Sequence, residues 1–465
     1  MVHIAFIYGE ARKKGFDKII AKIPSVCKVS VILSYQDEID FERKVDQENM
    51  FNDPVFSRKL TDQEIIDAEN WLGHSFYLAL QYNYLFYRGY NDQMKKLHEF
   101  YELIAQMVIY FREFFTKNKV DVYSTYVASR LPFIISILVA KKLGVTPLNL
   151  GTAGTSQTFV IRDFDFQPIF WKPINEKDIS AAKLFFLERY SKKKQENTDT
   201  LKENEKKFNI LNYFASDVSR LFKKASKKGY RLNYKPLIPS IKERFIRQLR
   251  RIFVPMLLQT PDWSKKFLFF PLHHDEETHL SWGEHFLNQY DLMKKVSDSL
   301  PGDTLLYIKP HPSWLCTDAP FFEMKKLKAL RNVRLIKSNI SPVELIKKSA
   351  GVVTINSTTG IEAIIFEKPL LTFGHSFYAE NGVAKCVRDL KHLQPDLEAI
   401  LKNPKQSYDQ KVRDVLLAKY HKHLIPTSVP LIYEFDFPDS DAKRVAEEMV
   451  AYLSILPSSP YKPPQ

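Results

Sequence analysis

The stretch SAGVVTINSTTGIEAIIFEKPLLTFGHSFY, residues Ser349–Tyr378, decides the fold of this chain. Residues 351–355 (GVVTI) form a continuous apolar, β-branched run, which is typical of a strand buried on both faces. A hydroxyl-rich turn at 356–360 (NSTTG), an amphipathic segment at 361–366 and a second apolar run at 370–373 follow. A strand, a turn, a helix and a strand in this order predict half of a parallel α/β sheet.

Three consecutive hydroxyl side chains, residues 357–359, occupy the predicted turn. The turn lies where a strand ends and a helix begins, so unpaired backbone N–H groups and the helix dipole favour an anion there, and the hydroxyls add donors. Ser and Thr also cap helices in many α/β proteins without binding a ligand. The turn alone therefore leaves capping and phosphate binding both open.

A second motif favours the phosphate site. Residues 304–308 (TLLYI) form another buried-strand pattern, which ends in residues 309–312 (Lys-Pro-His-Pro). We expect this to be a neighbouring strand, so that Lys309 and His311 face the same crevice as the hydroxyl turn. In open α/β sheets, ligands bind in the crevice at the carboxyl ends of the strands. The two motifs together predict a phosphate-binding site there.

These motifs resemble the HP motif and the Ser-Ser/Thr motif of GT-B glycosyltransferases that use CMP-activated acid sugars, namely bacterial sialyltransferases and Kdo transferases. The longer pattern over 341–378 is most similar to the capsule polysaccharide biosynthesis proteins, which include β-Kdo transferases. Residues 269–280 (FFPLHHDEETHL) also resemble the first strand and loop of the carboxyl-terminal domain in that family. The resemblance covers about residues 267–437. It implies a GT-B-like α/β fold, with two Rossmann-like domains facing across a cleft and a last helix crossing back to the first domain.

The domain organisation follows from length and from the resemblance. A chain of 465 residues is too long for one hydrophobic core and suits two domains. We expect a Rossmann-like acceptor domain over 1–175, a basic helical linker over 176–265 and a Rossmann-like nucleotide-sugar-binding domain over 266–437. A crossover helix and a disordered tail are expected over 438–465.

In the first domain, local patterns predict individual elements. A capping box that begins at Thr61 predicts a long helix towards Tyr90. Residues 120–150 predict a strand, a helix and a strand over 145–150, with Gly144 as the glycine that ends the helix. The acidic, polar residues 37–54 show no period and predict a loop.

Composition bounds the compartment and the cofactors. No run approaches the roughly 20 apolar residues of a membrane span. The first apolar stretch is too short for a signal peptide and predicts a strand. Cys27, Cys316 and Cys386 are far apart, so neither a disulfide framework nor a metal quartet is expected. We expect a cytoplasmic protein without cofactor or metal, peripheral at the inner membrane face if it binds lipid.

The net charge of +14 is concentrated in one part of the chain. Between Arg220 and Arg251, twelve Lys or Arg residues stand against one acidic residue. Over 241–256, apolar residues recur at helical spacing among basic residues, which is typical of a helix lying in an anionic membrane surface. An interdomain helix with a solvated basic face fits residues 220–256 equally well. Nucleic acid is not expected, because no binding module is recognisable and the aromatic residues are not interleaved with the charges.

The resemblance also assigns roles to residues near the predicted phosphate site. Cations and hydrogen-bond donors stabilise the charge that develops on a leaving phosphate. His311 could in addition protonate this phosphate, since its unperturbed pKa lies near working pH. Glu362 would accept hydrogen bonds from the ribose hydroxyls or serve as the partner of a lysine. The predicted nucleotide-binding residues are Lys309, His311, Ser357, Thr358, Thr359 and Glu362.

The catalytic base is expected in the first domain. Glu10, at the carboxyl end of the first strand, is the first candidate, although it could equally cap a helix. Asp163 and Asp165 are the alternatives. Their Asp-x-Asp pattern also matches a short metal motif of the other large glycosyltransferase fold, but nothing nearby in the sequence supports a metal site.

Three further residues are expected to contact the donor or the acceptor from loops: His273, Glu277 and His375. The histidines and acids around His273 fit no common zinc-ligand spacing. We therefore interpret them as loop residues and not as metal ligands.

Three functions remain open at this point. The first is metal-independent transfer of an acid sugar such as Kdo from CMP to a glycan or lipid-linked acceptor in capsule-type polysaccharide synthesis. The second is a CDP-polyol phosphotransferase of teichoic-acid type, which also carries an HP motif and a serine-rich turn at a strand end. The third is a non-catalytic partner in capsule assembly or export.

Overall fold

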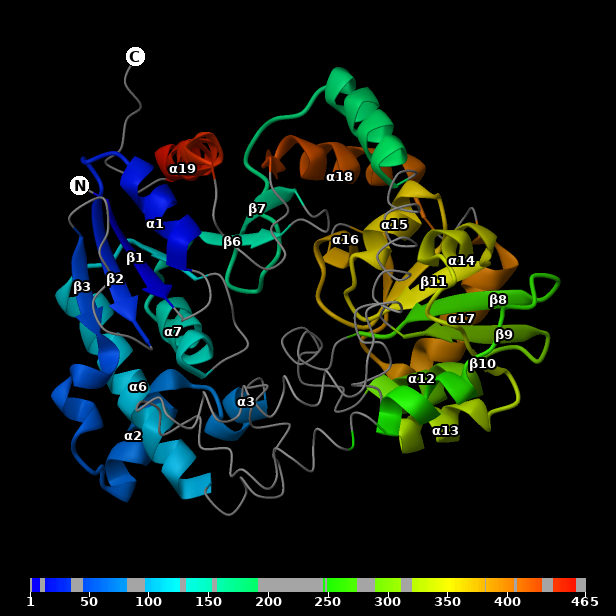
Figure 1. The fold of residues 1–465 in the computed structure, drawn as a ribbon, viewed down its shortest axis with the longest axis horizontal. Helices are drawn as coiled ribbons and strands as arrows, with labels where there is room; N and C mark the ends of the chain where they lie inside the picture. The colour runs from blue at the N-terminus through cyan, green and yellow to red at the C-terminus, as the bar shows by residue number, and fades with distance from the viewer. Residues whose placement is uncertain are drawn as a thin grey trace. The chain divides into compact units, whose positions relative to one another are not determined.

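The chain forms two compact units in the computed structural model: residues 1–173 with 422–465, and residues 174–421. In Figure 1 the blue and cyan elements with the red helix α19 belong to the first unit, and the green to orange elements around β8 belong to the second. The structure describes residues 2–8, 13–34, 45–81, 97–125, 131–152, 157–190, 246, 249–273, 289–310, 320–380, 382–404, 408–428 and 438–456.

The first unit is built on a five-stranded parallel sheet with the order β3-β2-β1-β4-β5. Helix α1 (Lys13–Lys22) connects β1 to β2, and α7 (Leu131–Lys142) connects β4 to β5. Parallel strands joined by crossover helices make this unit Rossmann-like. The strands are β1 (His3–Tyr8), β2 (Lys28–Leu33), β3 (Asp46–Asn49), β4 (Val122–Ser124) and β5 (Thr146–Pro147).

Two sequence predictions in this unit are wrong in part. Within the predicted loop 37–54, residues 46–49 pair with β2 as the edge strand β3. This strand is polar and its side chains are exposed or half-buried, so it gives no hydrophobic signal. Residues 145–150 were expected to form one strand, but they divide between β5 and a second sheet. That small antiparallel sheet contains β6 (Asn149–Thr152), β7 (Thr158–Arg162) and β14 (Ile425–Pro426).

The capping box at Thr61 is confirmed. The Thr61 hydroxyl accepts a hydrogen bond from the N–H of Glu64 at 3.3 Å, and the Glu64 carboxylate accepts one from the N–H of Thr61 at 2.9 Å. Helix α2 (Asp62–Leu72) nevertheless ends at Gly73, whose φ of 68° suits a glycine. It is therefore shorter than the predicted helix. The other helices of this part are α3 (Phe76–Gln81) and α6 (Leu97–Lys117).

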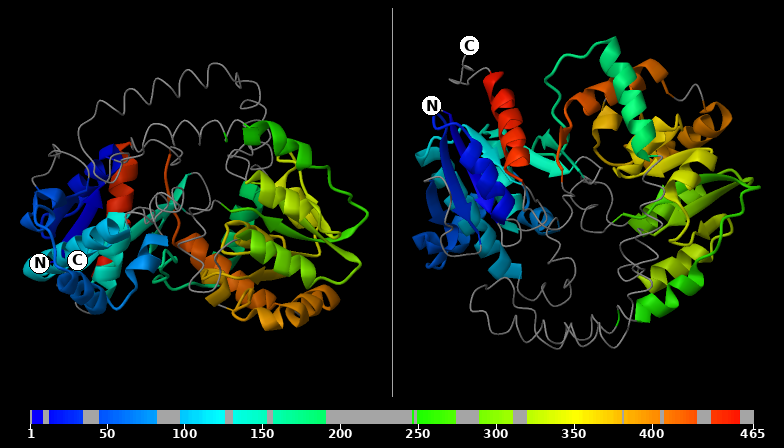
Figure 2. Two further views of the ribbon diagram at one scale, coloured as in Figure 1. Left: turned by 90° about the horizontal axis from the view of Figure 1, so that it is seen from below. Right: turned by 45° about the horizontal axis from the view of Figure 1, so that its top comes forward.

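The last helix, α19 (Asp439–Ser454), packs in the first unit. Its Val445 and Met449 are fully buried in one core cluster with Ile19 and Ile20 of α1. Figure 2 shows the red helix beside the blue α1. The predicted return of the final helix to the first domain is confirmed.

A histidine joins the two segments of the first unit that lead to and from the second. The backbone N–H groups of Trp171 and Lys172 both donate to Nε2 of His423, each at 2.8 Å. The rings of Trp171 and His423 lie 4.6 Å apart, and Lys172 forms an ion pair with Glu448 of α19 at 2.6 Å. Trp171 and Lys172, which lie just before the second unit in the chain, are therefore held against His423, which follows it.

The second unit contains a six-stranded parallel sheet with the order β10-β9-β8-β11-β12-β13. The chain builds outward from β8 to β10, returns to place β11 on the other side of β8, and then builds outward again. This is the doubly wound order of dinucleotide-binding folds, and it confirms an α/β fold with two Rossmann-like units. The strands are β8 (Lys266–Pro271), β9 (Thr304–Lys309), β10 (Val333–Leu335), β11 (Gly351–Thr354), β12 (Leu370–Thr372) and β13 (Lys385–Cys386).

Helices cover this sheet, and one core cluster combines side chains from β8, β9 and β11 with those of α12 and α17. The helices are α12 (Gln289–Asp298), α13 (Phe321–Lys328), α14 (Pro342–Lys348), α15 (Thr359–Ile365), α16 (Phe377–Glu380), α17 (Leu393–Lys402) and α18 (Gln410–Lys422).

The predicted linker contains a helix that is an integral part of the second unit. Residues 176–190 are helical, and Phe186 and Tyr190 are buried. Phe186 stacks on Tyr420 of α18, and Lys183 forms an ion pair with Asp414 at 2.7 Å. The sequence assigned these residues to the linker, but the apolar side of the helix packs against the second unit. Residues 191–245, which include most of the basic stretch 220–251, lie outside the described residues.

We expect Met449→Ala to lower the free energy of unfolding of the first unit by about 2–5 kcal/mol, because it leaves a cavity between α19 and α1. The matched control is Met256→Ala, since Met256 is 70% exposed and its loss should change stability by no more than about 0.5 kcal/mol. Urea unfolding of the full chain measures both. Equal effects of the two changes would contradict the packing of α19 described above.

Candidate functional site

The reversal of strand order in the second unit brings the carboxyl ends of β9, β8 and β11 together in that sequence. Lys309 ends β9, His273 follows β8, and the hydroxyl turn 357–359 follows β11. The expectation that β9 and β11 are neighbours is wrong, because β8 lies between them. All three strands are parallel, however, so the three groups lie along one edge of the sheet at its switch point.

Lys309 is a buried lysine at this edge. Its Nζ lies 3.4 Å from the carbonyl oxygen of Pro310, a long hydrogen bond to a neutral acceptor. A lysine at the carboxyl end of a strand is one of the groups that can contact a phosphate bound at the switch point of a parallel sheet.

The hydroxyl turn is well ordered by its own hydrogen bonds. The Ser357 hydroxyl accepts a bond from the N–H of Thr359 and donates to the Thr359 hydroxyl, both at 3.2 Å. The N–H of Ser357 donates to the hydroxyl of Thr354, the last residue of β11, at 3.3 Å. Thr358 is exposed between them. The Ser357 hydroxyl therefore closes the turn, whereas Thr358, the residue before α15, makes no side-chain capping bond. The hydroxyls of Thr358 and Thr359 are the groups that the turn can offer to a ligand.

Tyr378 fixes the position of the turn through a hydrogen bond and a close contact with Gly360. Its hydroxyl donates to the carbonyl oxygen of Ser357 at 2.9 Å. A Cβ atom on Gly360 would lie 2.5 Å from Cζ of the Tyr378 ring, so only glycine permits this approach. Burial raises the pKa of Tyr378, which keeps the phenol protonated and able to donate. Neither role of Tyr378 was predicted, although the residue lies within the stretch that decided the fold.

His273 braces the ends of β8 and β11. Its ring is buried, with Nε2 3.0 Å from the Thr354 hydroxyl and 3.3 Å from the backbone nitrogen of Ile355, which donates to it. The side chain of Gln289 bonds both the N–H and the carbonyl of His273 at 3.1 Å. Nε2 accepts from a main-chain N–H and therefore carries no proton. The structure thus gives His273, predicted as a substrate-contacting loop residue, a positioning role.

Glu362 and His375 lie at different depths. Glu362 is buried on α15, whereas His375 is exposed after β12. Burial, and then the nearby Glu362 carboxylate, raise the pKa of Tyr190, the last residue of helix 176–190. Glu362 therefore faces a helix that the sequence assigned to the linker. Tyr190 is a site neighbour that the sequence did not indicate, because its helix precedes a long charged segment.

Three predicted site residues lie outside the described residues: Glu10, expected as the base, His311, expected at the phosphate, and Glu277, expected to contact the donor or the acceptor. The alternative bases Asp163 and Asp165 are both described. Asp163 accepts the N–H groups of Asp165 and Gln167 at 2.9 and 2.8 Å, and Asp165 forms an ion pair with Lys141 at 2.7 Å. Both aspartates therefore stabilise the turn that follows β7. No group of three His, Cys, Asp or Glu residues among those described could hold a metal ion.

Comparison with known proteins identifies the second unit. Residues 264–423 match the family model for capsule polysaccharide biosynthesis proteins. This segment of the second unit is similar to capsule polysaccharide biosynthesis proteins. The match covers β8 to β13 and helix α18, and it includes Lys309, His273 and the hydroxyl turn.

Curated relatives of this family domain match over short segments. The capsule polysaccharide modification protein LipA of Neisseria meningitidis serogroup B is 28% identical over 105 residues, which are 23% of this chain and 15% of LipA. Protein FixF of Sinorhizobium fredii is 29% identical over 159 residues, 32% of this chain and 36% of FixF. The chain thus matches well under two thirds of the length of either relative.

Among solved structures, the β-Kdo 2,7 transferase KpsC of Thermosulfurimonas dismutans is similar with a TM-score of 0.34 and 17% identity, over 74% of this chain and 89% of KpsC. The S. aureus MnaA structure with UDP has a TM-score of 0.28 and 11% identity, over 99% of this chain and 100% of MnaA. None of the described helices is long and apolar enough to cross a membrane.

We expect Gly360→Ala to destabilise the second unit by about 1–3 kcal/mol, because the new methyl group collides with Tyr378. Gly302→Ala is the control, since an added Cβ there meets nothing within 4 Å. Urea unfolding compares the two variants. A Gly360→Ala protein as stable as Gly302→Ala would show that Tyr378 does not hold the turn tightly.

Proposed function

We propose that the protein is a glycosyltransferase of surface polysaccharide biosynthesis, which transfers an acid sugar such as Kdo from a CMP-linked donor to a glycan or lipid-linked acceptor. The observation that carries the proposal is that Lys309 and the hydroxyl turn lie along one edge of a parallel sheet, at its switch point, within the segment that matches the capsule polysaccharide family model. A lipid-linked acceptor would bring the enzyme to the cytoplasmic face of a membrane.

In the proposed reaction an acceptor hydroxyl oxygen attacks the anomeric carbon of the donor sugar. The bond from that carbon to the CMP phosphate oxygen breaks, and the phosphate leaves with the electron pair. Lys309, Thr358 and Thr359 would stabilise the negative charge that develops on the phosphate, and His311 would protonate or hydrogen-bond it. No metal ion is required in this scheme.

The proton of the acceptor hydroxyl must pass to a base. Glu10 remains the proposed base. Asp163 and Asp165 suit the role less well, because their carboxylates already accept two backbone hydrogen bonds and an ion pair. Glu362 would accept a ribose hydroxyl, although its burial beside Tyr190 also supports a purely supporting role for α15.

A thermal-shift screen with CMP-, CDP- and UDP-linked compounds tests the donor class. A ligand that binds only the folded protein raises its melting temperature, and a 100-fold excess over the dissociation constant stabilises by about 2.7 kcal/mol. We expect stabilisation by CMP and CMP-linked acid sugars. Stabilisation by CDP-polyols alone would instead favour the polyol phosphotransferase, and the absence of any shift would favour a non-catalytic partner.

His311→Ala and Lys309→Met should each lower the transfer rate on the order of 10²- to 10³-fold while the protein stays folded, because each removes a group that stabilises leaving-group charge. Lys309→Met keeps the length of the buried side chain and removes its charge. Lys368→Met is the matched control, since Lys368 is a half-buried lysine of the same unit that binds the Ser349 carbonyl at 3.0 Å. Turnover equal to that of the Lys368 variant would remove both residues from the mechanism.

A further inference from the structure

The second unit exposes five large apolar side chains on two neighbouring segments. The first segment comprises the helical residues 249–253 and the short helix η5 (Pro255–Leu257), and the second is the first turn of α13. The exposed fractions are 36% for Leu249, 51% for Ile252, 44% for Phe253, 70% for Met256 and 75% for Phe322. We call these five residues the apolar ridge.

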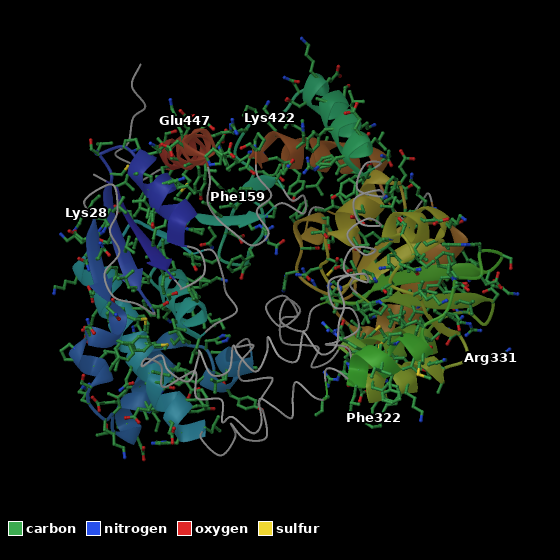
Figure 3. The ribbon with its side chains drawn as sticks, viewed as in Figure 1. Lys28, Phe159, Phe322, Arg331, Lys422 and Glu447 are labelled. Carbon is green, nitrogen blue, oxygen red and sulfur yellow. The ribbon has the colours of Figure 1, made fainter. Side chains whose placement is uncertain are left out.

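The two segments pack on each other. The rings of Phe253 and Phe321 lie 6.0 Å apart in an edge-on arrangement, and Phe321 in turn contacts Phe322 at 5.7 Å. Nζ of Lys328 lies 3.4 Å from the carbonyl oxygen of Met256. The sequence pattern indicated only the first segment, because α13 is too short to show a clear amphipathic pattern. Figure 3 shows the labelled Phe322 side chain at the outer side of α13.

Exposed lysines lie next to the ridge on α13. Lys325, Lys326 and Lys328 are all exposed on α13, and of these Lys326 forms an ion pair with Glu323 at 2.9 Å. The residues that lead into the first segment carry the concentrated charge of the chain, twelve Lys or Arg against one acid between Arg220 and Arg251. Exposed apolar side chains next to cations are typical of proteins that bind anionic membranes.

A second exposed apolar pair in the same unit provides a contrast. Leu184 and Leu187 of helix 176–190 are 62% and 48% exposed. The adjacent Lys183 forms an ion pair with Asp414, so its charge is compensated. Exposed leucines alone need no explanation, whereas the ridge combines apolar side chains with excess positive charge.

We propose that the apolar ridge docks on the surface of an anionic lipid bilayer. Ile252, Met256 and Phe322 enter the boundary between headgroups and acyl chains, at the depth of about 5–10 Å that amphipathic surface helices reach. Lys325 and Lys328 contact the anionic headgroups. The charge complementarity between this surface and anionic lipids selects the bilayer over a protein partner. The inference is independent of glycosyl transfer, but it would give the proposed enzyme access to a lipid-linked acceptor.

Sedimentation of the full chain with vesicles tests the proposal. Vesicles of phosphatidylcholine alone are compared with vesicles containing 30% phosphatidylglycerol. We expect binding to the anionic vesicles only, which weakens as added salt shortens the screening length to about 8 Å at physiological ionic strength. The double change Lys325→Glu and Lys328→Glu should weaken binding at least about 25-fold, since each cation contributes about fivefold.

The apolar part of the ridge is tested separately by changing Ile252, Met256 and Phe322 together to Ser. All three are exposed, so the fold should persist, and binding to anionic vesicles should fall about tenfold or more. The matched control changes Leu184 and Leu187 to Ser and should bind like the unchanged protein.

Two results would overturn the proposal: no binding to anionic vesicles at low salt, or equal binding by the ridge variant and its control. The nucleotide thermal shift, measured without lipid, should be the same for the ridge variant and the unchanged protein. That comparison separates failure of the membrane surface from failure of the proposed glycosyl transfer.

Discussion

The arrangement of the second unit depends on the pairing of β8 with β11. Residues 351 and 352 pair with 268 and 269, although more than 80 residues separate them in the chain. This pairing reverses the direction in which the sheet grows, and ligands of doubly wound sheets bind at such a reversal. It places the hydroxyl turn on one side of β8, and the pairing of β8 with β9 places Lys309 on the other.

Two buried rings then hold the ends of these strands and the hydroxyl turn in a fixed geometry. His273 ties the end of β8 to the end of β11, and Tyr378 ties the hydroxyl turn to the segment after β12. The hydrogen bond from Tyr378 fixes the turn through a backbone carbonyl, so it does not use the exposed hydroxyl of Thr358. A site that is rigid before its ligand arrives loses less entropy when the ligand binds. Among the polar side chains at the turn, His273 and Tyr378 hold it in position, whereas Thr358 faces solvent.

Sequence patterns predicted the parts of the fold that depend on local order. Three predictions of this kind are correct: the strand within 351–355, the turn at 356–360 and the capping box at Thr61. They succeed because strands buried on both faces and helix caps each require particular residue types. Strand order left no such mark, so β8 between β9 and β11 was not foreseen. The helix 176–190 was missed for another reason: its buried aromatic residues are few, and their partners on α18 lie more than 200 residues away.

The sequence predicted which residue types form the candidate site, but not how deeply each side chain is buried. Lys309 and the hydroxyl turn were identified because cations and hydroxyls at strand ends have a chemical meaning. The sequence could not tell that His273 is buried or that Glu362 lies beside Tyr190, since depth depends on what packs above each residue. Gly360 was noted as part of the turn, but the ring that requires it could be recognised only in three dimensions.

The return of α19 to the first unit affects the order in which the two units can fold during synthesis on the ribosome. The second unit is continuous in the chain, whereas the first is assembled from both ends. Domains generally fold in the order of their synthesis. Here the sheet of the first unit emerges early but lacks the helix that covers Ile19 and Ile20 until residue 449 has been made. The second unit can therefore complete its core first. The first unit keeps an apolar face uncovered until α19 has been translated.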